Sequence, residues 1–259
     1  MVKHSKAAVR SSRQAGSQAE VTASQFVEQI MLLRSAAELK KIQRYLKSSA
    51  DEYGDGDKFI GVRMGQVFAL AKQFMELQPA EIEKLLESPI HEVRAGAVSI
   101  MDFQARDKKT SAERRKELFN LYLRRHDRIN NWDLVDRSAP YVVGGYLFDK
   151  PRKVLYKLAR SKNVWERRTA IVSTWYFIRK GDIDDTFKLA ELLLDDNHDL
   201  IHKAAGGWLR EAGKRDRQRL LSFLDAHASR MPRTYLRYAT EHLDKKTRDH
   251  YLGLRKTKK

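Results

Sequence analysis

An indole and a carboxylate stand four residues apart in the stretch 130–136 (Asn-Asn-Trp-Asp-Leu-Val-Asp), at Trp132 and Asp136. On a helix this spacing places both side chains on one face, one turn apart. A ring face beside an acid can receive positive charge, either on a ligand or developing in a transition state. The spacing therefore predicts a site for cationic chemistry. From the residues alone, a core side chain is the favoured interpretation of Trp132, and Asp136 can simply pair with Arg137 or Arg168.

The rest of the chain is strongly basic. Its 51 Lys and Arg residues outnumber 34 Asp and Glu residues, which gives a formal net charge of +17 and an isoelectric point near 9.9. Such an excess favours a polyanionic partner, and an acidic pocket within basic surface suggests an enzyme acting on nucleic acid. Each cation alone can also belong to a solvated helix face. The cations that could follow a phosphate backbone are Arg124, Arg125, Arg128, Lys162, Lys203, Arg210, Arg233 and Arg237.

Several other chemistries find no support in the sequence. The chain has no Cys, so thiolate nucleophiles and thiolate metal ligands are excluded. His198 and His202 have the spacing of a metal pair, but no Glu follows His198 as in His-Glu-x-x-His, and Gly54–Lys58 lacks the ending of a phosphate-binding loop. We expect neither a metal nor a cofactor. No apolar run approaches the roughly 20 residues of a membrane span, and no secretory signal is visible, so a cytoplasmic location is expected.

Apolar residues recur at helical spacing almost throughout, with short breaks at Gly, Pro and Asp. Little alternation of period two is present, which argues against a sheet. We expect an all-α domain over residues 23–254. Residues 1–22 and 255–259 are interpreted as disordered basic tails that either make extra phosphate contacts or have no role.

The helical pattern also repeats. Residues 88–98, 161–171 and 196–206 align with one another, and each copy follows a Leu-rich or apolar helix. The offset is 73 residues from Arg94 to Arg167 and 35 residues from Arg167 to His202, so the Trp132 segment supplies the unit between the first two. A period in the middle thirties with two helices per unit predicts an α-solenoid, in which each repeat buries its apolar faces on its neighbours and leaves a concave surface for a partner.

The repeat register brings particular residues into line. Ala95, Asp136, Arg168 and Lys203 fall at nearly equivalent positions of successive second helices. We therefore expect all four to line one surface, the concave one. Asp133 points elsewhere on its helix and is expected to cap or bridge helices.

Several short motifs, by their residues, order and spacing along the chain, resemble those of the bacterial DNA alkylation repair glycosylases of the AlkD type. The resemblance covers most of residues 25–252 and is carried by several short segments. These are 54–59, 61–63, 130–136, 138–140, 165–168, 198–204 and 231–234.

The resemblance implies a monomeric, metal-free enzyme of HEAT-like repeats whose concave face clasps duplex DNA. Such an enzyme hydrolyses the N-glycosidic bond of cationic alkylpurines, for example 3-methyladenine and 7-methylguanine, without flipping the lesion into a pocket. It further implies that Trp132 and Asp136 are the aromatic and carboxylate of the site, with Arg168 beside them. We predict that Arg168 grips a backbone phosphate and helps to hold the site in register; the alternative is a salt bridge between repeats. The further DNA-binding residues that we predict are Lys203, Arg233 and Arg237.

One motif departs from the family pattern. Where the family has Lys-Ala-x-Gly-Trp-x-Leu-Arg-Glu, residues 203–211 place Gly207 at the tryptophan position and Trp208 one residue later. One residue on a helix is a rotation of about 100°, so Trp208 is not expected to point the same way without a local bulge. Trp208 is either a displaced site residue or a core residue. The pocket is then either opened for a bulkier adduct or part of a protein with reduced or no glycosylase activity.

Three functions therefore compete. The first is an alkylpurine DNA glycosylase, favoured by Trp132 and Asp136 within the ordered motifs. The second is a non-catalytic binder of damaged or distorted DNA, favoured by Gly207. The third is a protein scaffold, for which a solenoid alone suffices.

Overall fold

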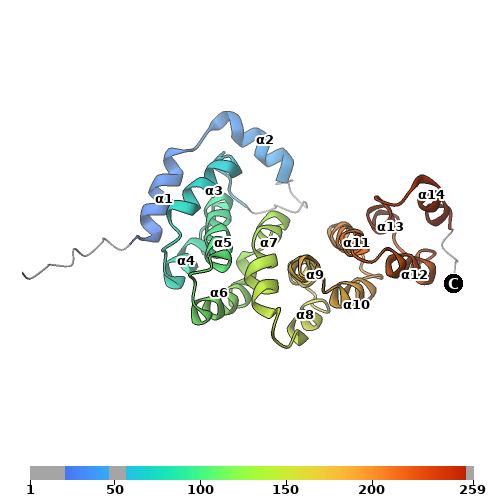
Figure 1. Ribbon diagram of the computed structural model, residues 1–259. Helices are drawn as coiled ribbons and strands as arrows, with labels where there is room; N and C mark the ends of the chain where they lie inside the picture. Colours follow the sequence, from blue (N-terminus) through green and yellow to red (C-terminus); the bar gives the residue numbers. More distant parts are fainter. Residues whose placement is uncertain (1–20, 47–56, 255–259) are drawn as a thin grey trace, which may run out of the picture.

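Stacked α-helices make up most of the described part of the chain, residues 21–46 and 57–254 of a computed structural model (Figure 1). Within it the only β pairing is an isolated bridge between Lys58 and Ile90. The α-helices are α1 (Ala23–Leu32), α2 (Ala36–Leu46), α3 (Met64–Gln73), α4 (Pro79–Leu86), α5 (His91–Arg106), α6 (Ala112–Arg124), α7 (Trp132–Ser138), α8 (Lys153–Leu158), α9 (Val164–Arg179), α10 (Asp184–Leu192), α11 (Asp199–Gly213), α12 (Arg217–His227), α13 (Arg233–Ala239) and α14 (Lys245–Gly253). A 3-10 turn η1 (His126–Arg128) precedes α7, and a π-helix η2 (Ala139–Gly145) follows it.

The helices form two layers. The inner layer runs α3, α5, α7, α9, α11 and α13, each packed against the next, while α4, α6, α8, α10 and α12 cover its outer side (Figure 1). Apolar side chains such as Leu134, Ile171 and Leu209 are fully buried. The predicted all-α solenoid is confirmed; that its repeats are HEAT-like remains a prediction.

The predicted repeat is visible in equivalent hydrogen bonds. Arg94, Arg167 and His202 each bond to the backbone carbonyl oxygen six residues earlier, at 3.0, 3.0 and 2.5 Å. The residue that supplies this carbonyl is Ser88, Ser161 or Asp196. Its side chain also accepts a hydrogen bond from the backbone N–H two residues later. The same turn therefore starts α5, α9 and α11.

The predicted register is also present, with one correction. Ala95, Asp136, Arg168 and Lys203 are each the fifth residue of their helix. The last three line one cavity, but Ala95 is only 3% exposed and belongs to the core. The expectation that all four share an open surface was wrong for Ala95, because α5 is covered by α3 and α4 at this end of the solenoid.

The predicted tails fall almost wholly outside the described residues. Of residues 1–22 only Val21 and Thr22 are described, and Thr22 caps α1 by accepting a bond from the Gln25 N–H. Residues 255–259 lie outside the described part. No helix of the described chain is long and apolar enough to cross a membrane.

α11 and α13 approach each other closely at a glycine of α11. A Cβ on Gly206 would lie 2.5 Å from the carbonyl oxygen of Tyr235 and 2.7 Å from the Cβ of Tyr238, whereas a Cβ on Gly207 would meet nothing within 4 Å. The two neighbouring glycines therefore have opposite roles in packing.

We predict that Gly206→Ala destabilises the fold by about 1–3 kcal/mol, since the new methyl group collides with backbone that cannot move alone. Gly207→Ala is the matched control and should stabilise the fold by about 0.5–1 kcal/mol through higher helix propensity. Urea unfolding of the two variants beside the unmodified chain measures both values. Shifts of the same sign would contradict this packing.

Candidate active site

The local sequence makes α7 short and starts it at Trp132. Asn131 has an extended backbone, and its side-chain oxygen accepts a 2.8 Å bond from the Trp132 N–H, which begins the helix. α7 passes after Ser138 into the wider turns of η2, which contains Pro140, a residue without an N–H for the helical ladder. Seven residues of α-helix thus carry the predicted Trp132 and Asp136 pair.

Two cavities meet at this pair. One, of about 580 Å³, opens toward α9, α11 and α13. The other, of about 610 Å³, opens toward α2 and α3, and Trp132 and Asp136 line both. The first cavity is also lined by Arg168, Leu200, Lys203, Ala204, Gly207, Trp208, Arg210 and Tyr238. The second is also lined by Lys41, Ile42, Met64, Phe68, Asp133 and Arg137.

Asp136 is held by Arg168. The Nε and Nη2 atoms of Arg168 donate to the two carboxylate oxygens at 2.9 and 2.7 Å, and Nη1 donates to the Leu200 carbonyl at 2.7 Å. The Arg168 side chain is only 8% exposed, whereas Asp136 is 36% exposed. A buried guanidinium thus fixes the carboxylate from behind and leaves it open to the cavity.

Arg137, the other candidate partner, is used elsewhere. Its guanidinium lies 4.5 Å from the ring centre of Phe68 and 4.7 Å from that of Phe103, and its Nη2 is 3.2 Å from the Asp102 carboxylate. Burial raises the pKa of the Asp102 carboxyl, because its effect is larger than the opposite effect of the neighbouring Arg137 and Arg106. Arg137 therefore builds a wall of the second cavity.

Trp208 lines the first cavity although it is one residue from the expected position. Its ring makes an edge contact with Trp175 at 6.4 Å between centroids, and it packs against the core. α11 continues through Gly206 and Gly207, so no bulge is involved. Trp208 therefore both packs against the core and borders the cavity, and its role as a site residue stays a prediction. Gly207 leaves open space in the same wall.

A buried network anchors the start of α7 from the other side. His91, fully buried, lies 2.9 Å from Asp57 through Nδ1 and 2.8 Å from Asp133 through Nε2. Arg94 also pairs with Asp57. Burial alone lowers the pKa of His91, but the charges and hydrogen bonds of Asp133 and Asp57 outweigh it and raise this pKa from 6.5 to about 9. Asp133 thus bridges two helices, and its other oxygen bonds to the Leu134 N–H, as expected.

The remaining predicted residues are not all at the site. Lys203 borders the first cavity and pairs with Asp199 at 2.5 Å, and Arg210, which also borders it, pairs with Glu241. Arg233 instead donates to the Leu252 carbonyl and lines a separate cavity against α14, while Arg237 is exposed outside the first cavity. The structure therefore brings Trp132, Asp136, Arg168, Lys203 and Trp208 together, and leaves Arg233 and Arg237 apart from them.

Of the other predicted phosphate-binding cations, three make contacts within the protein and one is exposed. Arg124 and Arg125 form ion pairs with Glu83 and Glu87 on α4 and after it, and Arg128 donates to backbone carbonyls at the end of α4. Lys162 is exposed.

His198 and His202, which have the spacing of a metal pair, both form hydrogen bonds with backbone groups. His198 accepts from the Leu200 N–H, and His202 bonds to the Asp196 carbonyl. Among the described residues no group of three or more His, Asp or Glu side chains is arranged to hold a metal ion.

Sequence reasoning missed two parts of the site. Tyr238 on α13 closes the first cavity, and Met64 and Phe68 on α3 line the second. Only the repeat register could have suggested Tyr238, since α13 follows α11 in the inner layer. Nothing in the spacing of Met64 and Phe68 separates them from core residues.

An inner layer of helices that presents a fixed carboxylate and an indole in one cavity defines an α-solenoid with a candidate site on its inner face. The chain belongs to the family of DNA alkylation repair enzymes, whose family model matches residues 27–243. It is an enzyme family of DNA alkylation repair, and DNA is the partner this membership implies. The resemblance of the motifs is thereby confirmed at the level of the family.

A solved structure agrees in fold. It is described as a predicted DNA alkylation repair enzyme from Enterococcus faecalis, with a TM-score of 0.65 and 18% identity over 82% of this chain and 97% of that one. The curated proteins contain no match to the chain.

We predict that His91 contributes a pH-dependent stability. Because its pKa is about 9 in the fold and 6.5 as the ordinary value, the contribution is complete below pH 6.5 and is lost as pH rises through 9. Its upper size is on the order of 3 kcal/mol, from about 1.4 kcal/mol per pKa unit. The facing groups are Asp57, Asp133 and the ring of Phe59.

Urea unfolding at pH 6 and pH 9.5 tests this for the unmodified chain and His91→Gln. The difference in unfolding free energy between the two proteins should shrink at the higher pH. A difference that stays constant would show that His91 is not charged in the fold.

Proposed function

We propose that this protein is a DNA glycosylase that hydrolyses the N-glycosidic bond of cationic alkylated purines, such as 3-methyladenine and 7-methylguanine, in duplex DNA. The observation that carries the proposal is the bidentate contact of Arg168 with Asp136, which leaves the carboxylate open in a cavity beside Trp132. Family membership supports the DNA repair setting. We propose that it acts as a monomer, as the family resemblance implies.

The chemistry matches the substrate. Alkylation of a purine ring nitrogen makes the base cationic, so it departs as a neutral molecule and needs no general acid. Positive charge then develops on the deoxyribose. Asp136 stabilises that charge and orients the attacking water, and the Trp132 ring adds a contact worth about 0.5–2 kcal/mol.

Arg168 acts in this proposal as a positioning residue. Nε, Nη1 and Nη2 each already donate to Asp136 or to the Leu200 carbonyl, and the side chain is buried. A phosphate contact therefore falls to cations at the rim of the cavity, Lys203 and Arg210. Arg233 and Arg237 remain candidates for contacts farther along the DNA.

A second candidate function is a non-catalytic binder of damaged or distorted DNA. The observation that favours it is the open space beside Gly207, in the wall where the family pattern has a tryptophan. Without that ring, the cavity surrounds a sugar or base less completely. Base release separates this function from the glycosylase.

We predict that the protein releases 7-methylguanine and 3-methyladenine from methylated duplex DNA and that Asp136→Asn lowers the rate about 10²–10³-fold, because the stabilising charge is removed. Asp184→Asn is the matched control, since Asp184 is a carboxylate paired with Arg219 and neither residue lines the cavity, and it should release base normally. Chromatography of the released bases gives the rates, and melting curves confirm that both variants fold.

Two results would overturn the catalytic role. One is an Asp136→Asn protein that works at the unmodified rate. The other is an unmodified protein that binds methylated DNA without releasing base but gains activity with Gly207→Trp, which would establish the non-catalytic binder.

We further predict that lesion charge controls the rate. A duplex with 7-methylguanine should lose its base far faster than one with neutral 1,N6-ethenoadenine, because the neutral base needs a proton before it leaves. Single-turnover rates on two duplexes that differ only in the lesion measure the ratio. Equal rates would rule out a mechanism without a general acid.

A further inference from the structure

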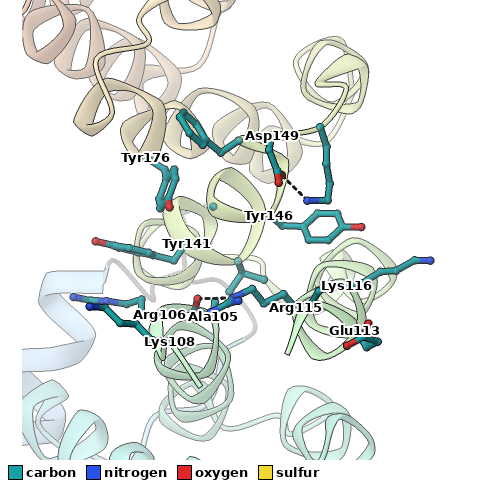
Figure 2. A pocket seen from close by; sticks show the side chains of 15 residues that line it. Ala105, Arg106, Lys108, Glu113, Arg115, Lys116, Tyr141, Tyr146, Asp149 and Tyr176 are labelled. Atoms are coloured by element: carbon teal, nitrogen blue, oxygen red, sulfur yellow. Dashed lines mark hydrogen bonds and ion pairs between the residues drawn. The ribbon is translucent and has the colours of Figure 1, made fainter. Parts of the chain in front are cut away.

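Another cavity lies at the edge of the solenoid, away from Trp132 and Asp136. It measures about 730 Å³ and is formed by the end of α5, the start of α6, η2 and the end of α9 (Figure 2). This volume falls in the usual range for ligand sites, about 300–1,000 Å³. We call it the edge cavity.

The lining of the edge cavity is cationic and aromatic. Its five cations are Arg106, Lys108, Arg115, Lys116 and Lys150, against two carboxylates, Glu113 and Asp149. Figure 2 shows Tyr141, Tyr146 and Tyr176 around the hollow, with Arg106 and Lys108 along its lower side. Cations interleaved with rings are the pattern that holds the backbone and bases of single-stranded nucleic acid.

Not all of these cations are bound to protein groups. Arg115 donates to the carbonyls of Ala105 and Asp107, and Lys150 pairs with Asp149. Lys108 and Lys116 are exposed, and neither forms an ion pair within residues 21–46 and 57–254. These two side chains therefore supply positive charge for a ligand.

The rings of the cavity already bind cations on their faces. The Arg106 guanidinium lies 4.5 Å from the centre of the Tyr141 ring, and the Lys150 ammonium lies 4.6 Å from that of Tyr146. The Arg106 side chain is 46% exposed. Its Nη1 also pairs with the buried Asp102 carboxylate at 3.3 Å. The guanidinium can therefore move off the Tyr141 face for a stacked base while this pair keeps its charge beside the phosphate.

A row of rings joins the edge cavity to the candidate active site. Tyr176 contacts Tyr141 at 5.6 Å between centroids, Tyr141 contacts Trp175 at 5.9 Å, and Trp175 contacts Trp208 at 6.4 Å. Trp208 lines the first cavity. Arg179 lies over Trp175 at 4.8 Å, so the row has a cation along its length.

We propose that the edge cavity binds an unpaired nucleotide of the same nucleic acid that occupies the active-site cavity. A base paired within a duplex exposes only its edges, so away from a duplex end, rings set in a hollow can stack only on an unpaired base. The row of rings gives the strand a continuous path, and this favours a tethered nucleotide over a free one. The proposal needs DNA binding but not bond cleavage by Asp136.

The test compares a blunt duplex with the same duplex carrying a short single-stranded tail, by fluorescence anisotropy at one salt concentration. The tail should tighten binding about tenfold, the effect of stacking one base at the lower end of its range. The double variant Lys108→Glu/Lys116→Glu should abolish the difference between the two duplexes. Lys188→Glu/Lys246→Glu makes the same charge change at exposed positions outside the edge cavity and should preserve it.

A second readout reports stacking itself. The adenine analogue 2-aminopurine in the tail should be quenched on binding, and Tyr141→Leu should remove the quenching. Equal affinity for both duplexes, or a tail preference that survives in Lys108→Glu/Lys116→Glu, overturns the proposal. Displacement of the tail by equally dilute adenosine monophosphate overturns it in favour of a free-nucleotide site.

Base release distinguishes this proposal from the proposed function. Lys108→Glu/Lys116→Glu should still release base from a saturating blunt methylated duplex, because neither lysine is at the active-site cavity. Loss of the tail effect with intact release is the expected pattern. A protein that shows no release but a full tail effect would refute the glycosylase and support the edge cavity.

Discussion

The contact between Arg168 and Asp136 is the interaction on which the site depends. Arg168 comes from α9, Asp136 from α7 and the Leu200 carbonyl from α11, so one guanidinium joins three successive inner helices. A buried charge is tolerated only when it is paired and hydrogen-bonded, and removal of one partner of such a pair costs about 3–5 kcal/mol. α7 is short and gains little stability from its own hydrogen bonds. Its orientation is therefore set from two sides, by Arg168 of α9 and by His91 of α5 through Asp133.

The solenoid explains how one register supplies different chemistry. In three repeats a cation or imidazole bonds to the carbonyl six residues earlier, which fixes the first turn of the inner helix. The residue after this cation or imidazole is then the fifth of its helix in each of these repeats. This fifth position is Arg168 on α9 and Lys203 on α11, and on α7 it is Asp136. A carboxylate and its cationic neighbours are thus placed side by side by the repeat itself, without any dedicated loop.

Sequence periodicity predicted the helices, their register and the Trp132 and Asp136 pair, because these depend on neighbours within one helix or on a constant offset. It left open whether Asp136 pairs with Arg137 or Arg168, since spacing within a helix gives no information about contacts across helices. It also failed for Ala95, which is covered where α5 meets α3 and α4, and it gave no sign that Arg233 turns toward α14. Contacts of this kind depend on which elements cover which, and only the three-dimensional packing decides that.

The two adjacent glycines of α11 show what the site requires of its wall. Gly206 is fixed by packing, because any side chain there would collide with the backbone of Tyr235. Gly207 has no such constraint, and in a helix interior it costs about 0.5–1 kcal/mol relative to Ala. Gly207 provides space in the cavity that Asp136 also lines, while Trp208 still supplies an aromatic surface from the next position. The wall is therefore widened and keeps one ring, so the cavity can hold a larger group than an indole at position 207 would allow.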